Sequence, residues 1–263
     1  MTGEQAALTG IASATEHAAE LRSRGDDPTP RGVVRAVMAA ASEHGVFDWD
    51  GHCVNGDTLR VLDVCAGYGC WASEMRRLAV SQGWPVHITG AEIHAPREPH
   101  LDKWCDDWAL DDWRIALGPT SGLDHTSFDL VIGNPDFAQL LRDNAGNFVE
   151  PAETMPAVLL RHAPAVLLLH TQQALLKSKA GCACWREYSP AASWMVPGGV
   201  KFRGPNVGAD QRCYQVTLWL RSHTGPCSTY MLEDLEPHDR AWSVLPGAED
   251  PSADLPARPG WSP

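Results

Sequence analysis

Apolar residues along the chain fall into two kinds of pattern, and the two kinds alternate. Compact apolar blocks typical of buried strands occur at 58–64, 86–93, 113–118, 128–133 and in the first half of 165–176. Alanine-rich or helically spaced apolar positions predict helices at 4–23, 32–45, 71–83, 100–110 and 152–162. Two later blocks, 192–204 and 213–221, predict a hairpin-like pair of strands.

Strands that alternate with helices predict an α/β fold, with a mostly parallel twisted sheet and helices on both faces. Ligands of such sheets bind beyond the carboxyl ends of the strands, where the strand order reverses. We divide the chain into an N-terminal helical extension at 1–26, a main domain at 27–221 and an acidic, proline-rich tail at 222–263. We expect the tail to be partly disordered.

The composition suits one large domain, because the chain has 263 residues and 44% apolar content. It contains no run of eighteen apolar residues, and residues 1–25 lack the basic start and apolar block of a signal peptide. None of the eight cysteines forms a C-x-x-C pair. We therefore expect a cytoplasmic protein with reduced thiols, no membrane contact and no metal site.

The net charge of −12 argues against non-specific nucleic-acid binding by the chain as a whole. The charge is unevenly spread, however. Residues 177–221 contain seven lysines and arginines against two acids, a net charge of +5, whereas residues 222–263 have a net charge of −5. The average therefore hides a basic segment followed by an acidic tail.

A carboxylate lies at the end of the first predicted strand, and glycines follow it, in VLDVCAGYGCWA. Gly67, Gly69 and Ala72 match the G-x-G-x-x-A pattern of dinucleotide sites, although glycines after a strand also form ordinary tight turns. Asp63 favours S-adenosylmethionine over a dinucleotide such as NAD. Its carboxylate would repel the pyrophosphate of NAD, whereas it suits the positive sulfonium and ammonium groups of S-adenosylmethionine. We therefore predict S-adenosylmethionine as the cofactor. The turn that would hold it consists of Cys65, Ala66, Gly67 and Gly69.

Two further strand ends carry polar residues. Glu92 lies 25 positions beyond Gly67 at the end of the second predicted strand, where a carboxylate can accept hydrogen bonds from both ribose hydroxyls of a cofactor. The alternative for Glu92 is an ordinary solvated glutamate. The fourth predicted strand runs into Asn134-Pro135-Asp136-Phe137. By itself this motif is also compatible with a common Asn-Pro turn.

In combination, VLDVCAGYGCWA, GAEI and FDLVIGNPDF resemble Rossmann-type S-adenosylmethionine-dependent methyltransferases. The closer resemblance is to enzymes that methylate exocyclic amino groups in DNA, whose fourth-strand motif is Asn/Asp-Pro-Pro-Tyr/Phe. DPTPRGVVRAVM is similar to the Thr-Pro segment of many adenine methyltransferases. PGGVKFRGPNVGADQRCYQVTLWLR resembles the late segment of small phage-type DNA adenine methyltransferases, so the resemblance covers roughly residues 27–221.

The resemblance implies a Rossmann-like sandwich with DNA adenine-N6 methyltransferase activity. Thr29 and Pro30 would contact the methionine part of the cofactor, which Asn134 also borders. The Asn134 side-chain oxygen and the Pro135 carbonyl would accept the two N–H groups of a flipped adenine. In the same motif, Phe137 would stack on the base. Asp136 is not part of the family pattern, but its carboxylate could take the proton after methyl transfer.

The sequence departs from the family pattern at two places. Asp136 stands where the family usually has a proline. The predicted third strand ends at Gly118, where the family often has an acid near the adenine of the cofactor. Asp111 and Asp112 lie upstream of that position.

We expect DNA to contact the basic segment 177–221, chiefly at Lys201, Arg203 and Arg212, and mostly through phosphates. The acidic residues after Arg221 are unfit to read base edges, so we expect short or relaxed sequence specificity. Two alternatives remain. In the first, the chain is a methyltransferase that acts on a protein glutamine or on an RNA amino group. In the second, it has lost catalytic activity and only binds S-adenosylmethionine or a partner.

Overall fold

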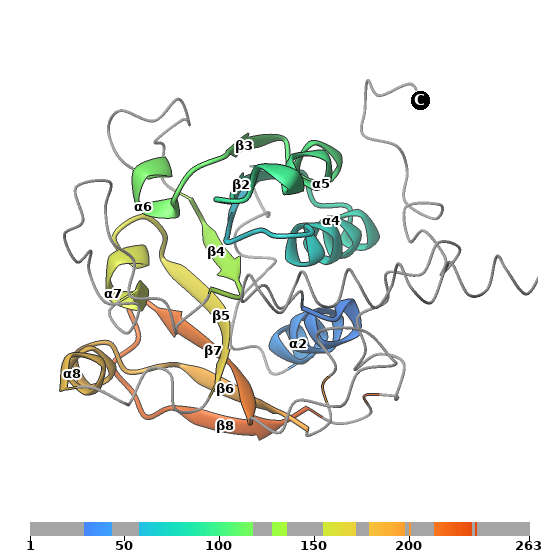
Figure 1. The fold of residues 1–263 in the computed structure, drawn as a ribbon. Helices are drawn as coiled ribbons and strands as arrows, with labels where there is room; N and C mark the ends of the chain where they lie inside the picture. Colours follow the sequence, from blue (N-terminus) through green and yellow to red (C-terminus); the bar gives the residue numbers. More distant parts are fainter. Residues whose placement is uncertain are drawn as a thin grey trace, which may run out of the picture.

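The computed structural model of the chain describes residues 29–43, 58–117, 128–135, 155–171, 179–197, 200, 213–232 and 235, without the side chains of 114 and 115. The described residues form one eight-stranded sheet in the order β3-β2-β1-β4-β5-β7-β6-β8 (Figure 1). The strands are β1 (Leu59–Val64), β2 (Val86–Ala91), β3 (Asp107–Ala109), β4 (Leu130–Gly133), β5 (Ala165–Thr171), β6 (Ala192–Val196), β7 (Tyr214–Leu220) and β8 (Ser228–Met231). All neighbours pair in parallel except β7, which is antiparallel to both β5 and β6.

Helices cover both faces of this sheet (Figure 1). They are α2 (Arg31–Glu43), α4 (Cys70–Gln82), the 3₁₀ helix η1 (Ala95–Arg97), α5 (Glu98–Trp104), α6 (Trp113–Ala116), α7 (Met155–Leu159) and α8 (Lys179–Glu187). Successive side chains of a strand point to opposite faces, so Leu167 packs with α2 and α4 while Leu168 packs with α6 and α7. The predicted α/β sandwich with a mostly parallel sheet is confirmed.

The third strand was predicted in the wrong place. Residues 113–116 form helix α6 instead of a strand, and β3 lies inside the predicted helix 100–110. Trp113 and Ala116 are both buried and lie three residues apart, a spacing that suits one face of a helix as well as an apolar block. β3 has only three residues and an exposed Asp107, so it shows no apolar periodicity of its own. The predicted helix 4–23 lies outside the described residues.

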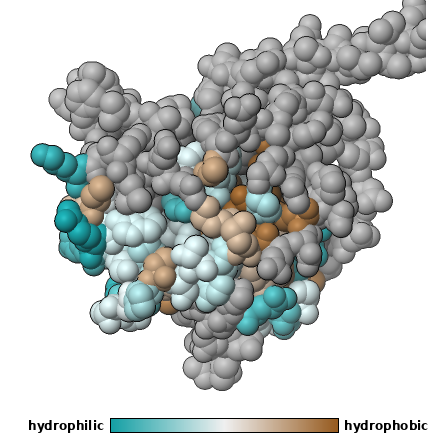
Figure 2. Space-filling model, turned by 90° about the horizontal axis from the view of Figure 1, so that it is seen from below, coloured by the Kyte–Doolittle hydropathy of each residue, from teal (hydrophilic) through white to brown (hydrophobic). Residues whose placement is uncertain are grey.

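The sheet continues beyond residue 221, where the sequence predicts the end of the main domain. Strand β8 pairs in parallel with β6, and the ring of Tyr230 stacks on that of Trp194 at 5.9 Å. Figure 2 views the molecule from the β8 side, where described surface is mostly pale to teal and apolar residues gather toward the centre. Among the described helices, none combines the length and the apolar character that a membrane crossing needs.

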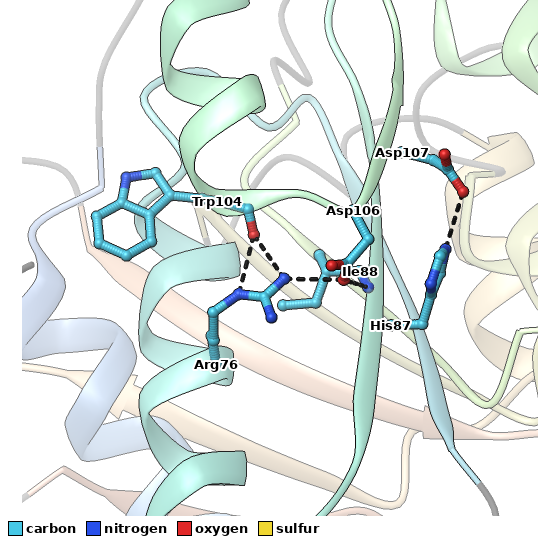
Figure 3. A network of polar contacts seen from close by, with 6 residues as sticks. All are labelled: Arg76, His87, Ile88, Trp104, Asp106 and Asp107. Atoms are coloured by element: carbon cyan, nitrogen blue, oxygen red, sulfur yellow. Dashed lines mark hydrogen bonds and ion pairs between the residues drawn. The ribbon is translucent and has the colours of Figure 1, made fainter. Parts of the chain in front are cut away.

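A polar network fixes α4 against the turn between α5 and β3 (Figure 3). The Arg76 guanidinium donates to the Trp104 carbonyl oxygen through Nε and Nη2, at 3.3 and 3.2 Å. Its Nη2 also donates to Asp106 Oδ2 at 2.8 Å, and the same oxygen accepts the Ile88 amide at 2.8 Å. Arg76 thereby holds the end of α5 and the edge pairing of β2 and β3 in one arrangement.

We expect Arg76→Ala to lower the free energy of unfolding by about 1.5–3 kcal/mol, the usual contribution of hydrogen bonds to charged groups. The change leaves the Asp106 carboxylate and the Trp104 carbonyl without this donor. Urea denaturation measures the difference. Arg77→Ala is the matched control, because Arg77 is 43% exposed and its buried partner Glu74 keeps both hydrogen bonds from Arg35. Equal losses in the two variants would contradict the structural role of Arg76.

Candidate functional site

The carboxyl ends of β1, β2 and β4 meet at one edge of the sheet. Val64, the last residue of β1, is the register partner of Ala91 on one side and of Gly133 on the other. The residues that follow these strands therefore emerge side by side at the point where the strand order reverses. This geometry brings together the predicted glycine loop, Glu92 and Asn134.

The glycine loop after β1 is a left-handed turn. Cys65, Gly67 and Gly69 have φ values of 56°, 54° and 69°. The loop is closed by backbone bonds from Ala66 N to Ala91 O at 3.0 Å and from Gly69 N to Ala66 O at 2.8 Å. A Cβ at Gly69 would come within 2.6 Å of the Trp104 ring, so both the backbone angle and the space require glycine there.

Glu92 is buried and bound to the glycine loop, so the alternative of an ordinary solvated glutamate is wrong. Its Oε2 accepts the Gly67 amide and its Oε1 accepts the His94 amide, both at 2.8 Å. Each carboxylate oxygen has a second lone pair, which leaves capacity for one hydroxyl at each oxygen. The arrangement is therefore compatible with the predicted role of Glu92 toward a ribose.

Asp63 has a buried carboxylate oxygen to which no described residue donates. The side chain is fully buried, and its Oδ2 accepts the Ala72 amide at 3.0 Å, whereas Oδ1 has no hydrogen-bond partner among the described residues. Burial raises the pKa of Asp63 well above its ordinary value. The Ala72 hydrogen bond opposes this shift, and the neighbouring Glu92 carboxylate adds to it. A buried carboxylate of this kind suits a cationic donor group.

Asn134 and Pro135 follow β4 directly, half-buried and buried respectively. Gly133 precedes them with φ of 155°, and a Cβ on this residue would overlap the Val64 carbonyl oxygen. Glycine thus lets β4 approach the end of β1, which places Asn134 beside the start of the glycine loop. Asp136 and Phe137 lie outside the described residues.

We expect Gly133→Ala to cost about 2–4 kcal/mol of folding free energy, because it adds a steric overlap to a strained backbone angle. Chemical denaturation measures the loss. Gly83→Ala is the matched control, since Gly83 has φ of 71° but no atom lies within 4 Å of the position that a Cβ would take there. A loss at Gly133 no larger than at Gly83 would show that the close approach of the two strands is not required.

Thr29 and Pro30 lie next to the helix that packs on α4. Both are buried, and the Pro30 carbonyl accepts the amides of Val33 and Val34 at 3.1 and 3.3 Å at the start of α2. Arg31 follows them, with its guanidinium 5.1 Å from the centre of the Trp104 ring. The structure therefore brings this distant segment to the neighbourhood of the glycine loop.

The corrected position of β3 changes the interpretation of Asp111 and Asp112. They come directly after Leu110 at the carboxyl end of β3, a place that the sequence analysis assigns to Gly118. A bond from Glu92 N to Ala109 O at 3.1 Å joins this end to that of β2. Two apolar residues are exposed here, Ile93 at 49% and Leu110 at 38%. Neither residue was singled out from the sequence, although Ile93 follows Glu92 as an apolar residue after a polar one at a strand end.

His170 is a further buried residue at this edge that the sequence analysis missed. Leu168 is the register partner of Gly133, so His170 lies level with Pro135 on the next strand. Its Nδ1–H donates to the Thr171 carbonyl at 2.9 Å, which makes Nε2 the acceptor of the Thr217 hydroxyl at 2.9 Å. Burial lowers the pKa of His170 to about 4. The neutral ring thus fixes the end of β5 beside the Asn134-Pro135 turn.

The predicted DNA contacts Lys201, Arg203 and Arg212 lie outside the described residues. The segment that contains them begins after β6 and ends before β7. Val196 at the end of β6 pairs with Tyr214 at the start of β7. Tyr214 also pairs with Thr171 at the carboxyl end of β5. Both ends of the segment therefore lie at the same edge of the sheet as Asn134. Among the described residues, no group of three or more potential metal ligands occurs.

No family model and no curated protein matches the chain. One similar solved structure, from Vibrio vulnificus YJ016, is assigned to a putative type I restriction enzyme as a modification subunit. It matches with a TM-score of 0.54 and 16% identity, over 91% of this chain but only 57% of that chain. Another, a putative class I S-adenosylmethionine-dependent methyltransferase from Listeria monocytogenes, has a TM-score of 0.52 and 13% identity, over 79% of this chain and 67% of that chain. At these identities the likeness shows the fold alone, and the Rossmann-like methyltransferase sandwich is confirmed.

Proposed function

We propose that the chain is an S-adenosylmethionine-dependent methyltransferase that modifies the N6 amino group of adenine in DNA. The observation that carries the proposal is the position of Asn134, beside a left-handed glycine loop and a buried carboxylate, Asp63, whose Oδ1 accepts from no described residue. A cationic methyl donor and an amine can therefore be held on neighbouring strands. The fold shared with a modification subunit of a restriction enzyme supports DNA as the acceptor.

The cofactor part of the proposal follows from the charges at the ends of β1 and β2. Asp63 Oδ1 is an acceptor for a cationic amine, and the second lone pairs of Glu92 are acceptors for ribose hydroxyls. Ile93 and Leu110 offer apolar contact to a purine, and Asp111 or Asp112 is the acid near its amino group. Thr29 and Pro30 border the methionine part. S-adenosylmethionine, when bound, supplies an electrophilic methyl group.

The substrate part of the proposal concerns the turn after β4. An adenine amino group is a poor nucleophile because its lone pair is delocalised into the ring. Two acceptors, the Asn134 side-chain oxygen and the Pro135 carbonyl, would engage the two N–H groups and localise that lone pair. Proline limits the backbone freedom of the turn, which helps to keep both acceptors aimed. Phe137 would stack on the flipped base, and Asp136 is the adjacent carboxylate for the released proton.

DNA binding is expected to involve Lys201, Arg203 and Arg212 and to read phosphates more than base edges. The double variant Lys201→Ala/Arg203→Ala should bind all sequences more weakly and should reduce the salt dependence of binding by about two phosphate contacts. Fluorescence anisotropy over a range of salt concentrations measures both effects, with Arg77→Ala as control. An unchanged salt slope would contradict this contact surface, and modification confined to one motif of six or more base pairs would contradict relaxed specificity.

A transfer assay with tritiated S-adenosylmethionine tests the proposed function against its alternatives. The purified chain is incubated with DNA, RNA and a protein extract in separate reactions, and labelled DNA is digested to nucleosides. The proposal expects label in DNA as N6-methyladenine. Methylcytosine would refute the base, label in protein or RNA would favour the other acceptors, and cofactor binding without transfer would indicate the decayed alternative, which the Asp136 departure favours.

A further inference from the structure

Two aromatic rings hold together the three segments that border the proposed cofactor site. The guanidinium of Arg97 lies over the Tyr68 ring at 3.5 Å from its centre, and His100 meets the same ring edge-on at 5.0 Å. Arg31 lies over Trp104 at 5.1 Å. We call these five residues the cation–aromatic clamp. It joins the segment after Pro30, the glycine loop and the segment after Glu92.

Tyr68 is the residue of this clamp that belongs to the glycine loop. It lies between Gly67 and Gly69, which both have left-handed backbone angles. Glycines leave a loop with more conformational freedom than any other residue, so such a loop holds one shape only if its neighbours restrain it. The side chain of Tyr68 is the one large group that the Gly67–Gly69 turn offers for restraint.

Arg97, which lies over the Tyr68 ring, is itself buried. It ends η1 and is only 6% exposed, an uncommon degree of burial for an arginine. Cation–π contacts are stronger when they are shielded from water. Burial and the charges of Arg97, Lys103 and Arg31 lower the pKa of His100, so its ring packs against Tyr68 in the neutral form at neutral pH.

The second ring supports the same loop one residue further on. Trp104 fills the space that a side chain at position 69 would need. Arg31 covers the Trp104 ring, and its charge lies near the Cys70 thiol at the start of α4. Arg76 holds the Trp104 carbonyl from α4. Rotation of the glycine loop would therefore disturb contacts on both of its sides.

We propose that Arg97 is a positioning residue for the cofactor. Through the Tyr68 ring it holds the Gly67 amide on Glu92 and keeps the glycine loop in its binding conformation before the cofactor arrives. This inference rests on the proposed use of S-adenosylmethionine. A planar guanidinium is required for stacking at this distance, so a lysine at position 97 supplies the charge but not the function.

Calorimetric titration of S-adenosylmethionine into full-length variants tests the inference. Arg97→Met and Arg97→Lys should each weaken cofactor binding about tenfold, since the cofactor must then order the loop itself. Tyr68→Leu should have the same effect, and Tyr68→Phe, which keeps the ring, should stay within about twofold of the unchanged protein. Arg97→Met combined with Tyr68→Leu should be no weaker than either change alone. Arg77→Met, on an exposed part of α4, is the control.

Two readouts separate positioning from a general loss of stability. Hydrogen exchange in the unliganded protein should accelerate at the amides of residues 67–70 in Arg97→Met and remain unchanged in the body of the sheet. In the transfer assay, the KM for the cofactor should rise while kcat at saturating cofactor stays the same. Unchanged affinity together with unchanged exchange in Arg97→Met would overturn the inference. If the unmodified protein bound no S-adenosylmethionine, the proposed function would fail instead, and hydrogen exchange would still test the clamp.

Discussion

Asn134→Ala is expected to reduce methyl transfer by at least about 100-fold and to change cofactor affinity by less than about threefold. Loss of one preorganised hydrogen-bonding group that acts on the reacting atoms typically costs a factor of 10² to 10³ in kcat. Asn134 would engage the amine as its charge develops, so the loss should appear in the rate rather than in cofactor binding. Single-turnover transfer of a labelled methyl group to DNA measures the rate.

Asn134→Asp is the informative companion variant. It retains a side-chain oxygen at the same position, and the DNA methyltransferases that the sequence resembles have either asparagine or aspartate there. Its rate should therefore lie between those of the unchanged protein and of Asn134→Ala. Full activity in Asn134→Ala, or a loss explained entirely by weaker cofactor binding, would remove Asn134 from the proposed chemistry.

Asp63→Asn is expected to weaken S-adenosylmethionine binding by about 10- to 150-fold. A hydrogen bond to a charged group contributes about 1.5–3 kcal/mol, and 1.4 kcal/mol corresponds to a factor of ten. No described residue donates a hydrogen bond to Asp63 Oδ1, so none of them can substitute for the contact with a cationic ligand. Calorimetry on the variant measures the loss, and binding equal to that of the unchanged protein would contradict the assignment of Asp63.

The raised pKa of Asp63 adds a pH dependence with a definite sign. In the unliganded protein, burial favours the protonated carboxyl, so its stabilising contribution is complete below the ordinary pKa of an aspartic acid and is lost as the pH rises through the raised pKa. A cationic ligand favours the carboxylate. Cofactor affinity should therefore rise with pH up to that raised pKa, and binding below it should release a proton. Calorimetry in buffers of different ionisation enthalpy detects this release, which should vanish in Asp63→Asn.

The central strands could be predicted because their sequences alone make them buried strands. β4 and β5 are apolar along nearly their whole length, as strands covered on both faces must be. The ends of such strands then identified Asp63, Glu92 and Asn134, because parallel strands place their carboxyl ends at one edge. This part of the site required no knowledge of contacts between distant residues.

The edge strands β3 and β8 could not be predicted in this way. β3 has three residues and contains Asp107, and β8 reads Ser-Thr-Tyr-Met with three exposed positions. Each is a strand because it pairs with a neighbour, β2 or β6, and not because of its own apolar pattern. The error at β3 also left Asp111 and Asp112 without a place at a strand end, since they follow a strand that the sequence did not reveal.

The loops required the structure for a different reason. The bond of Glu92 to the Gly67 amide depends on the left-handed turn at Cys65 and Gly67. The contact between Arg97 and Tyr68 joins residues of two separate loops. No sequence-spacing rule for arginine or tyrosine predicts such a contact. The groups proposed to contact ligands could therefore be singled out from the sequence, but those that hold these groups in place could not.

The central claim is that the edge formed by β1, β2 and β4 binds a cationic methyl donor and not a dinucleotide. Calorimetric titration of the unchanged chain with S-adenosylmethionine and, separately, with NAD tests it most directly. At a pH above the raised pKa of Asp63, the account predicts binding of one S-adenosylmethionine per chain and no measurable binding of NAD, because the ionised Asp63 would attract the first and repel the pyrophosphate of the second. Binding of NAD without binding of S-adenosylmethionine would contradict it.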